Sequence, residues 1–259
     1  MEYLKLNSLR GRILKASHNS GEGHIPSCLS ILDLLWCLYD QVLSLDPFDQ
    51  GRDIFILSKG HASLALYAVL AEKGFIESSS LVDFVRFHSQ LGGHPDKNKI
   101  PYVEASTGSL GHGLPIALGI ALAKRSQNLS GNTYVLVGDG ECNEGTIWES
   151  ALLASHHRLN RLCCIVDFNH STDRALGIGS LVNKFEAFDW EVKEIDGHNH
   201  SQIISVLRGF RSNNNLRPLC IVANTVKGKG LTRMENNPEW HHKSPNASEL
   251  EELLRELGE

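Results

Sequence analysis

Two polar residues 30 positions apart predict a metal site for a bound diphosphate. Asp139 lies in Gly138-Asp139-Gly140, directly after the apolar run Tyr134–Val137, and Asn169 comes just after the apolar run Cys163–Val166. Each therefore ends a predicted strand, which is where ligands bind in open parallel sheets. Carboxylate and amide oxygens are hard ligands that suit Mg²⁺ or Ca²⁺ carrying phosphate oxygens. The flanking glycines let the backbone approach the anion.

The elements that must position these residues alternate between strand and helix. Short apolar runs predict buried strands, and segments of helical periodicity lie between them. This alternation predicts an α/β fold of three layers, α/β/α, with a mostly parallel sheet covered by helices on both faces. The predicted strands are 54–57, 133–137, 162–166, 191–195 and 219–223, and the predicted helices are 4–16, 30–43, 63–73, 80–88, 110–125, 146–158, 201–211 and 247–257.

Composition narrows the class of protein. Hydrophobic residues at 41% and charged residues at 21% are ordinary for a soluble globular chain, and without repeats or a long linker a single domain over 1–259 is expected. The net charge of -5 gives no reason to expect nucleic acid or acidic membranes as partners. No apolar run approaches the roughly 18 residues of a membrane span, and the first residues lack the features of a signal peptide. We therefore expect a cytoplasmic protein.

The six cysteines are expected to be reduced structural thiols. They show no Cys-x-x-Cys spacing, and Cys163 and Cys164 fall inside a predicted buried strand. Intracellular α/β proteins use cysteine mainly as a small buried hydrophobic residue.

Several histidines lie in polar loops rather than at core positions. His24, His61 and His94 each follow a glycine, in the short segments 20–26, 58–62 and 92–95. Taken singly, each could equally be a solvated loop residue. Imidazole exchanges protons near neutral pH, so several rings around one cavity would suit an enzyme that handles hydroxyl and carbonyl oxygens.

Other polar residues have plainer interpretations. His156 and His157 end a predicted helix, where a surface or dipole-capping role is favoured. His198 and His200 lack a third nearby ligand and are weak zinc candidates. The segment 226–230 could cradle phosphate or be a solvated basic turn, but it lacks the spacing of a P-loop.

Taken together and in order, motifs along the whole chain resemble transketolase. The match covers only the N-terminal half of a full-length transketolase, the domain that binds the diphosphate end of thiamine diphosphate. The motifs are Ser58-Lys59-Gly60-His61-Ala62, Gly93-His94-Pro95, Thr107-Gly108-Ser109-Leu110-Gly111, Gly138-Asp139-Gly140-Glu141, Asp196-Gly197-His198, Val226-Lys227-Gly228-Lys229-Gly230 and Trp240-His241.

The resemblance implies a thiamine diphosphate-binding fold and a role for each matching residue. Asp139 and Asn169 would bind Mg²⁺ or Ca²⁺, with the backbone carbonyl of Ser171 as third ligand. Glu144 would resemble the glutamate at the family's dimer interface. The residues implied as catalytic are His24, His61, His94 and His241, and those implied in the cofactor site are Lys59, His61, Gly108, Ser109, Leu110, Gly138, Asp139, Gly140, Glu144, Asn169 and Lys227.

The resemblance also implies a partner. In this family the glutamate that activates the cofactor's aminopyrimidine belongs to a separate pyrimidine-binding domain, and no part of this chain resembles it. We therefore expect one subunit of a split transketolase, completed by a separate C-terminal subunit in an α2β2 heterotetramer. It would transfer a two-carbon ketol unit from a ketose or ketose phosphate to an aldose, so its substrates would be sugars or sugar phosphates.

Two departures and two alternatives remain open. His112 stands where the family usually has glutamine, and the segment 170–178 departs from the usual pattern, which hints at an altered substrate. The α-subunit of a 2-oxo acid dehydrogenase also pairs Gly-Asp-Gly with a downstream asparagine, but the motifs around His61 and His94 argue against it. A non-catalytic, cofactor-binding subunit of the same fold is the other alternative.

Overall fold

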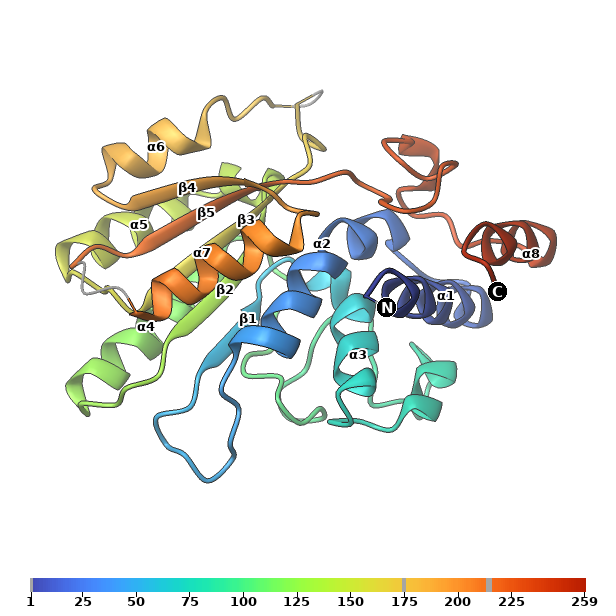
Figure 1. Ribbon diagram of the computed structural model, residues 1–259, viewed down its shortest axis with the longest axis horizontal. Coiled ribbons are helices and arrows are strands. Elements are labelled where there is room, and N and C mark those ends of the chain that lie inside the picture. The colour runs from blue at the N-terminus through green and yellow to red at the C-terminus, as the bar shows by residue number, and fades with distance from the viewer. Residues whose placement is uncertain (1, 174–175, 213–215) are drawn as a thin grey trace.

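A parallel sheet organises the chain. The computed structural model describes residues 2–173, 176–212 and 216–259, and among them five strands form one sheet in the order β1-β2-β3-β5-β4, with every neighbouring pair parallel (Figure 1). All five predicted strands are confirmed. Their bounds are β1 Ile54–Leu57, β2 Thr133–Gly138, β3 Leu162–Phe168, β4 Glu191–Asp196 and β5 Leu219–Asn224.

Helices cover both faces of the sheet, as the alternating pattern predicts. Successive side chains of a strand point to opposite faces, and so Tyr134 and Leu136 join one hydrophobic cluster while Val135 and Val137 join the other. The first cluster is completed by α2 Ile25–Cys37, α3 Ser63–Glu72 and α7 His200–Ser212, and the second by α4 Gly113–Ser126, α5 Gly145–His156 and α6 Leu181–Ala187.

Two further helices lie against the first cluster rather than on the sheet itself. The first helix, α1 (Glu2–Ser20), packs against α2 and α3, and the last, α8 (Ala247–Glu256), packs against α1. Figure 1 shows the two ends of the chain side by side at this edge of the molecule. The chain's final segment, which carries His241, is thereby brought next to its first loop.

Two helices begin at residues other than those predicted, for reasons of local backbone chemistry. The helix predicted from residue 30 begins at Ile25, because Pro26 suits the first turn of a helix, and it ends in a π-helical turn, Leu38–Val42. The helix predicted from residue 110 begins at Gly113, because Gly111 has a φ of +81° that helical residues do not adopt.

The α-helix predicted over 80–88 was wrong. A short 3₁₀ helix covers Ser78–Asp83 instead, and the chain then turns at Val85, whose φ of +59° is incompatible with a helix. The Val85 N–H donates to the Leu91 carbonyl at 2.8 Å, so a wide local turn replaces helical hydrogen bonds. Helix α6 was not predicted, although Ser180 caps it by accepting from the Asn183 N–H at 3.2 Å.

The six cysteines are buried thiols, in agreement with the predicted structural role. Burial raises the pKa of the Cys28 thiol to about 11, which keeps it protonated and unreactive. Within the described residues, no helix has both the length and the hydropathy of a membrane span.

Packing at the start of α4 can be tested with two glycines of the same helix. A Cβ on Gly113 would lie 2.3 Å from Ser58 Oγ, whereas a Cβ on Gly119 meets nothing within 4 Å. We expect Gly113→Ala to lower the free energy of unfolding by about 1–3 kcal/mol through overpacking. Gly119→Ala should raise it by about 0.5–1 kcal/mol through helix propensity. Denaturant unfolding measures both; equal effects would contradict the close packing of Gly113 on Ser58.

Candidate active site

A cavity of about 350 Å³ opens where the carboxyl ends of the strands meet. Polar residues that follow β1, β2, β3 and β5 reach it together, as the strand-end position of Asp139 and Asn169 predicts. Its walls are formed by His24, Ser27, Lys59, His61, His94, Gly108, Leu110, Gly138, Asp139, Gly140, Glu141, Asn169, Ser171, Lys227 and His241.

The three residues predicted to bind the metal lie in direct contact, although Ser171 makes these contacts with its N–H and hydroxyl rather than with the predicted carbonyl. Asp139 accepts from the Ser171 N–H at 2.9 Å and from the Ser171 hydroxyl at 3.0 Å, while Asn169 Oδ1 accepts from the same N–H at 3.1 Å. Asp139 also accepts from the Gly140 N–H at 2.7 Å. Oxygens from two strand ends therefore converge on one point at the floor of the cavity.

The chemistry of this group fits a hard cation. Asn169 Nδ2 donates to Asp167 at 3.0 Å, which turns the amide oxygen, the better metal ligand, toward Asp139 and Ser171. Burial and the charge of Asp167 raise the pKa of Asp139, although hydrogen bonds from Gly140 and Ser171 oppose this. A bound divalent cation would relieve this carboxylate repulsion.

A buried ion pair lies directly behind the cavity. Asp167, which is 0% exposed, accepts from Lys59 Nζ at 2.5 Å and from Ser30 Oγ at 2.7 Å. The hydroxyl of Thr225 donates to its other oxygen. Sequence reasoning placed Lys59 in the site but gave Asp167 no role; a carboxylate two residues before Asn169, at the end of a buried strand, was the available signal.

A second buried carboxylate, Glu141, fastens three loops of the cavity and was also missed. It accepts from the N–H groups of Gly111 at 2.9 Å and Gly138 at 3.0 Å, and from the hydroxyl of Ser58. Ser58 in turn accepts from the Gly113 N–H at 3.0 Å. The loops after β1 and β2 and the start of α4 are thereby held together. Its place in the motif Gly138-Asp139-Gly140-Glu141, close behind the predicted metal ligand, was the available sequence signal.

The predicted histidines gather on the opposite wall of the cavity. The ring of His24 lies 5.1 Å from that of His61 and 5.7 Å from that of His241, measured between centroids. Burial, together with the neighbouring His242 and His241, lowers the pKa of His24 to about 4. Burial and Lys59 lower the pKa of His61 still further, so both rings are neutral near pH 7. Each neutral ring can accept a hydrogen bond from an uncharged hydroxyl at one nitrogen and donate one at the other.

Lys227 is positioned by a network that starts from a different pair of histidines. His198 donates to Asp33 at 2.9 Å and its other nitrogen accepts from the Val226 N–H at 2.8 Å, next to Lys227. His200 also contacts Asp33, at 2.8 Å, and this hydrogen bond raises its pKa to about 10. His198 and His200, left outside the predicted site, thus support the loop rather than line the cavity.

The loop after β5 also contacts the histidines directly. Lys227 Nζ lies 2.8 Å from His241 Nδ1, and the Gly228 N–H donates to the Pro26 carbonyl at 3.0 Å. Burial and the charge of Lys59 lower the pKa of Lys227. A lysine and an imidazole in contact at a cavity wall can share and pass on a proton.

The remaining predicted residues differ in their placement. Gly108 packs closely against His94, because a Cβ on this glycine would lie 3.0 Å from the His94 ring. Leu110 and Gly140 also line the cavity. Ser109 and Glu144, by contrast, are exposed and lie outside the lining. His112 is exposed as well, with Nδ1 3.0 Å from the Leu110 carbonyl. In the atypical segment 170–178, residues 174 and 175 lie outside the described residues.

Comparison with known proteins agrees with this geometry. Residues 3–259 match the family described as "Transketolase, thiamine diphosphate binding domain". The chain is 40% identical, over 98% of its length and 94% of the relative, to an apulose-4-phosphate transketolase subunit from Actinobacillus succinogenes. It is 36% identical to the 6-deoxy-6-sulfo-D-fructose transketolase subunit SqwG of a Clostridium strain, over 91% of this chain and 88% of that one.

A solved structure extends the comparison to three dimensions. Transketolase from Campylobacter jejuni superposes with a TM-score of 0.90 at 29% identity. The superposition covers 100% of this chain but 43% of that one. This chain therefore corresponds to less than half of the longer protein.

The low pKa of His24 predicts a pH dependence of stability. The ring's pKa is 6.5 in the unfolded chain and about 4 in the folded protein. At a pH between these two values, the unfolded chain binds a proton at this ring that the folded protein does not take up. The free energy of unfolding should therefore fall as the pH falls through this window. We expect His24→Asn to reduce that fall, measured by urea unfolding at pH 7.5, 6.0 and 5.0. An unchanged pH dependence would show that His24 is not held neutral by its surroundings.

Proposed function

Because this chain belongs to the transketolase family as its thiamine diphosphate-binding domain, we propose that it supplies the diphosphate half of a two-chain active site. The observation that carries the proposal is the convergence of Asp139, Asn169 and Ser171 opposite the imidazoles of His24 and His61. Together they would bind thiamine diphosphate through Mg²⁺ or Ca²⁺ and present its reactive end to a sugar.

Each side of the cavity has its own part in this function. Asp139, Asn169 and the Ser171 carbonyl would hold the metal, and Gly138 leaves room for the diphosphate, since a Cβ there would meet only Lys59, at 3.8 Å. Thiamine diphosphate would supply the nucleophilic carbon needed for ketol transfer from a ketose to an aldose. The protein residues orient both sugars and exclude water.

We assign proton transfer to the histidines that line the cavity. Neutral His24 and His61 would accept hydrogen bonds from donor hydroxyls, and His94 would lie beside them at the exposed side of the cavity. The Lys227–His241 pair offers a proton close to the same place. These assignments use His24 and His61 in the neutral state that burial favours.

A second chain completes the proposed enzyme. The relatives of matching length are called subunits, and the longer Campylobacter protein has the rest of its chain beyond the matched part. The exposed Leu152 and Leu153 of α5, on the helix that Glu144 begins, offer an apolar surface for assembly. We propose an α2β2 heterotetramer in which Glu144 lies at an interface between subunits, as the family resemblance implies.

The substrate is proposed to be a specialised sugar. Two relatives of matching length are named for apulose-4-phosphate and for 6-deoxy-6-sulfo-D-fructose, both sugars with an anionic group. The lysines and histidines of the cavity suit such a ligand. The proposal further takes residues 1–259 as one domain, and takes the protein to be cytoplasmic, which its buried thiols favour.

Metal-dependent cofactor binding tests the floor of the cavity. We expect Asp139→Ala to weaken thiamine diphosphate binding at least about 10-fold in the presence of Mg²⁺, because it removes a charged metal ligand. Asp173→Ala is the matched control, since Asp173 is exposed and contacts His170. Isothermal titration calorimetry on each variant measures the affinity. Equal affinities in the wild type and Asp139→Ala would refute the metal site.

Activity tests the requirement for a second chain. The purified chain alone, with thiamine diphosphate and Mg²⁺, should show no ketol transfer, because the carboxylate that activates the aminopyrimidine is expected on the partner. Adding the C-terminal subunit should restore turnover, followed by chromatography of the sugar products. Robust turnover by the isolated chain would overturn the proposed division of the active site.

A further inference from the structure

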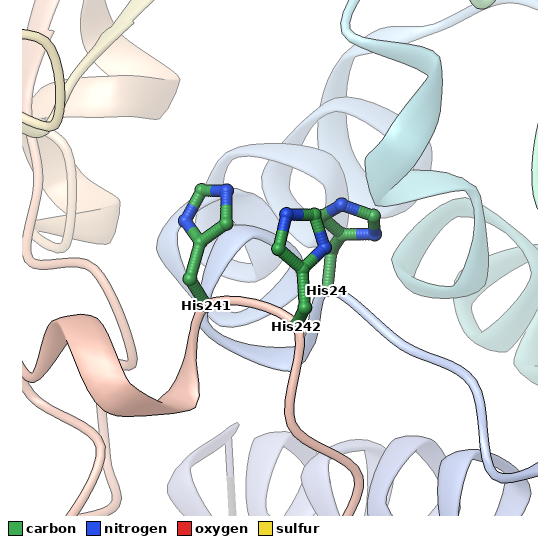
Figure 2. Close-up of side chains that lie close together, drawn as sticks. All are labelled: His24, His241 and His242. Carbon is green, nitrogen blue, oxygen red and sulfur yellow. The ribbon is translucent and has the colours of Figure 1, made fainter.

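Three imidazoles meet at the mouth of the cavity: those of His24 and His241, which line it, and that of His242. His242 lies beside His241, and its ring is 4.3 Å from that of His24 and 4.4 Å from that of His241. One ring nitrogen from each lies within 4.8 Å of the other two. Figure 2 shows the three side chains side by side, with a nitrogen of His241 turned toward the His242 ring.

The nitrogens of this group are largely unused by the protein. Among the residues that the structure describes, neither His24 nor His242 has a hydrogen-bond partner for its ring, and His241 uses Nδ1 alone, with Lys227. Imidazole nitrogens that are grouped but not hydrogen-bonded are available as metal ligands.

The backbone holds the two sides of the group together. Ser17 and Ser244 are linked by a hydrogen bond of 2.8 Å from the Ser244 hydroxyl to the Ser17 carbonyl, and His18 Nδ1 lies 2.7 Å from the Pro245 carbonyl. The Ser17 hydroxyl also donates to the Glu22 carbonyl at 2.6 Å. The loop before His24 and the segment after His242 are therefore fixed relative to each other before any ligand arrives.

We propose that His24, His241 and His242 form a binding site for a transition-metal ion of the Zn²⁺ class, separate from the hard-cation site at Asp139. Three imidazoles with an open fourth position are a donor set that suits Zn²⁺, Co²⁺ and Ni²⁺. Tetrahedral coordination at about 2.0–2.1 Å brings ligand nitrogens to about 3.3 Å from one another. The nitrogens lie within 4.8 Å of one another, so His241 and His242, neither of which is buried, must both rotate to close that difference.

The two cation sites differ in ligand chemistry and in surroundings. The floor offers carboxylate and amide oxygens, which Mg²⁺ prefers, and the mouth offers only nitrogen, which Mg²⁺ binds poorly. The nearby Lys227 opposes any cation at the mouth, so moderate rather than tight binding is expected. An ion there would occupy His24 and His241, and a sugar could not use those rings at the same time.

Cobalt(II) titration of the full-length chain tests this site directly. We expect one Co²⁺ per chain with the intense visible absorption of tetrahedral coordination, undisturbed by excess Mg²⁺. His242→Gly should weaken binding at least about tenfold, because loss of a ligand costs no less than loss of a group that supports one. Since the readout is the spectrum of this chain alone, it is independent of whether the partnered enzyme transfers ketol groups.

Two controls separate the site from other histidines and from the Asp139 site. His157→Ala alters another pair of adjacent histidines, whose rings are 5.0 Å apart, and should leave Co²⁺ binding unchanged. Asp139→Ala should leave it unchanged as well. His242→Gln, which keeps a side chain of similar length, should lose affinity as His242→Gly does while keeping the wild-type melting temperature. Undiminished Co²⁺ binding in both His242 variants, or its loss in Asp139→Ala, would overturn the proposal.

Discussion

The buried carboxylate of Asp167 is the contact on which the arrangement of the cavity depends. It lies at the end of β3 and is hydrogen-bonded by Ser30 of α2, Lys59 after β1 and Thr225 after β5. A buried charge is stable only when paired and hydrogen-bonded, and removing one partner of such a pair typically costs about 3–5 kcal/mol. The Asp167 carboxylate therefore holds four separate segments together. It also orients Asn169, whose side-chain N–H donates to it.

Glu141 imposes a similar constraint on the other side of the cavity. Its two oxygens accept from the N–H groups of Gly111, in a loop, and Gly138, at the end of β2, and from the hydroxyl of Ser58, just after β1. Burial raises its pKa, and these donors favour the charged form. The loops that carry Lys59, Gly108 and Asp139 are thus rigid without being part of regular secondary structure. A preorganised site is what positioning a large cofactor requires.

The cavity separates two kinds of chemistry. Oxygen ligands gather at the floor, close to β2 and β3, and imidazoles gather at the mouth, on segments from opposite ends of the chain. The packing of α8 on α1 makes this possible, because it brings the segment of His241 and His242 beside the loop of His24 (Figure 2). Burial, together with the neighbouring His242 and His241, lowers the pKa of His24 and so leaves its ring nitrogens unprotonated near pH 7. Hydroxyl binding and transition-metal binding would then be two uses of one arrangement.

The sequence alone determined the strands, the α/β class and the pairing of Asp139 with Asn169. These follow from apolar runs and strand ends, which are local properties of the chain. The sequence pattern did not predict the turn at Val85, which the Val85–Leu91 hydrogen bond closes, or the helix α6, although its Ser180 cap is a local signal. Nor did it determine the roles of Asp167 and Glu141 or the meeting of His242 with His24. Those depend on residues distant in sequence that only the folded sheet and its loops bring within hydrogen-bond reach.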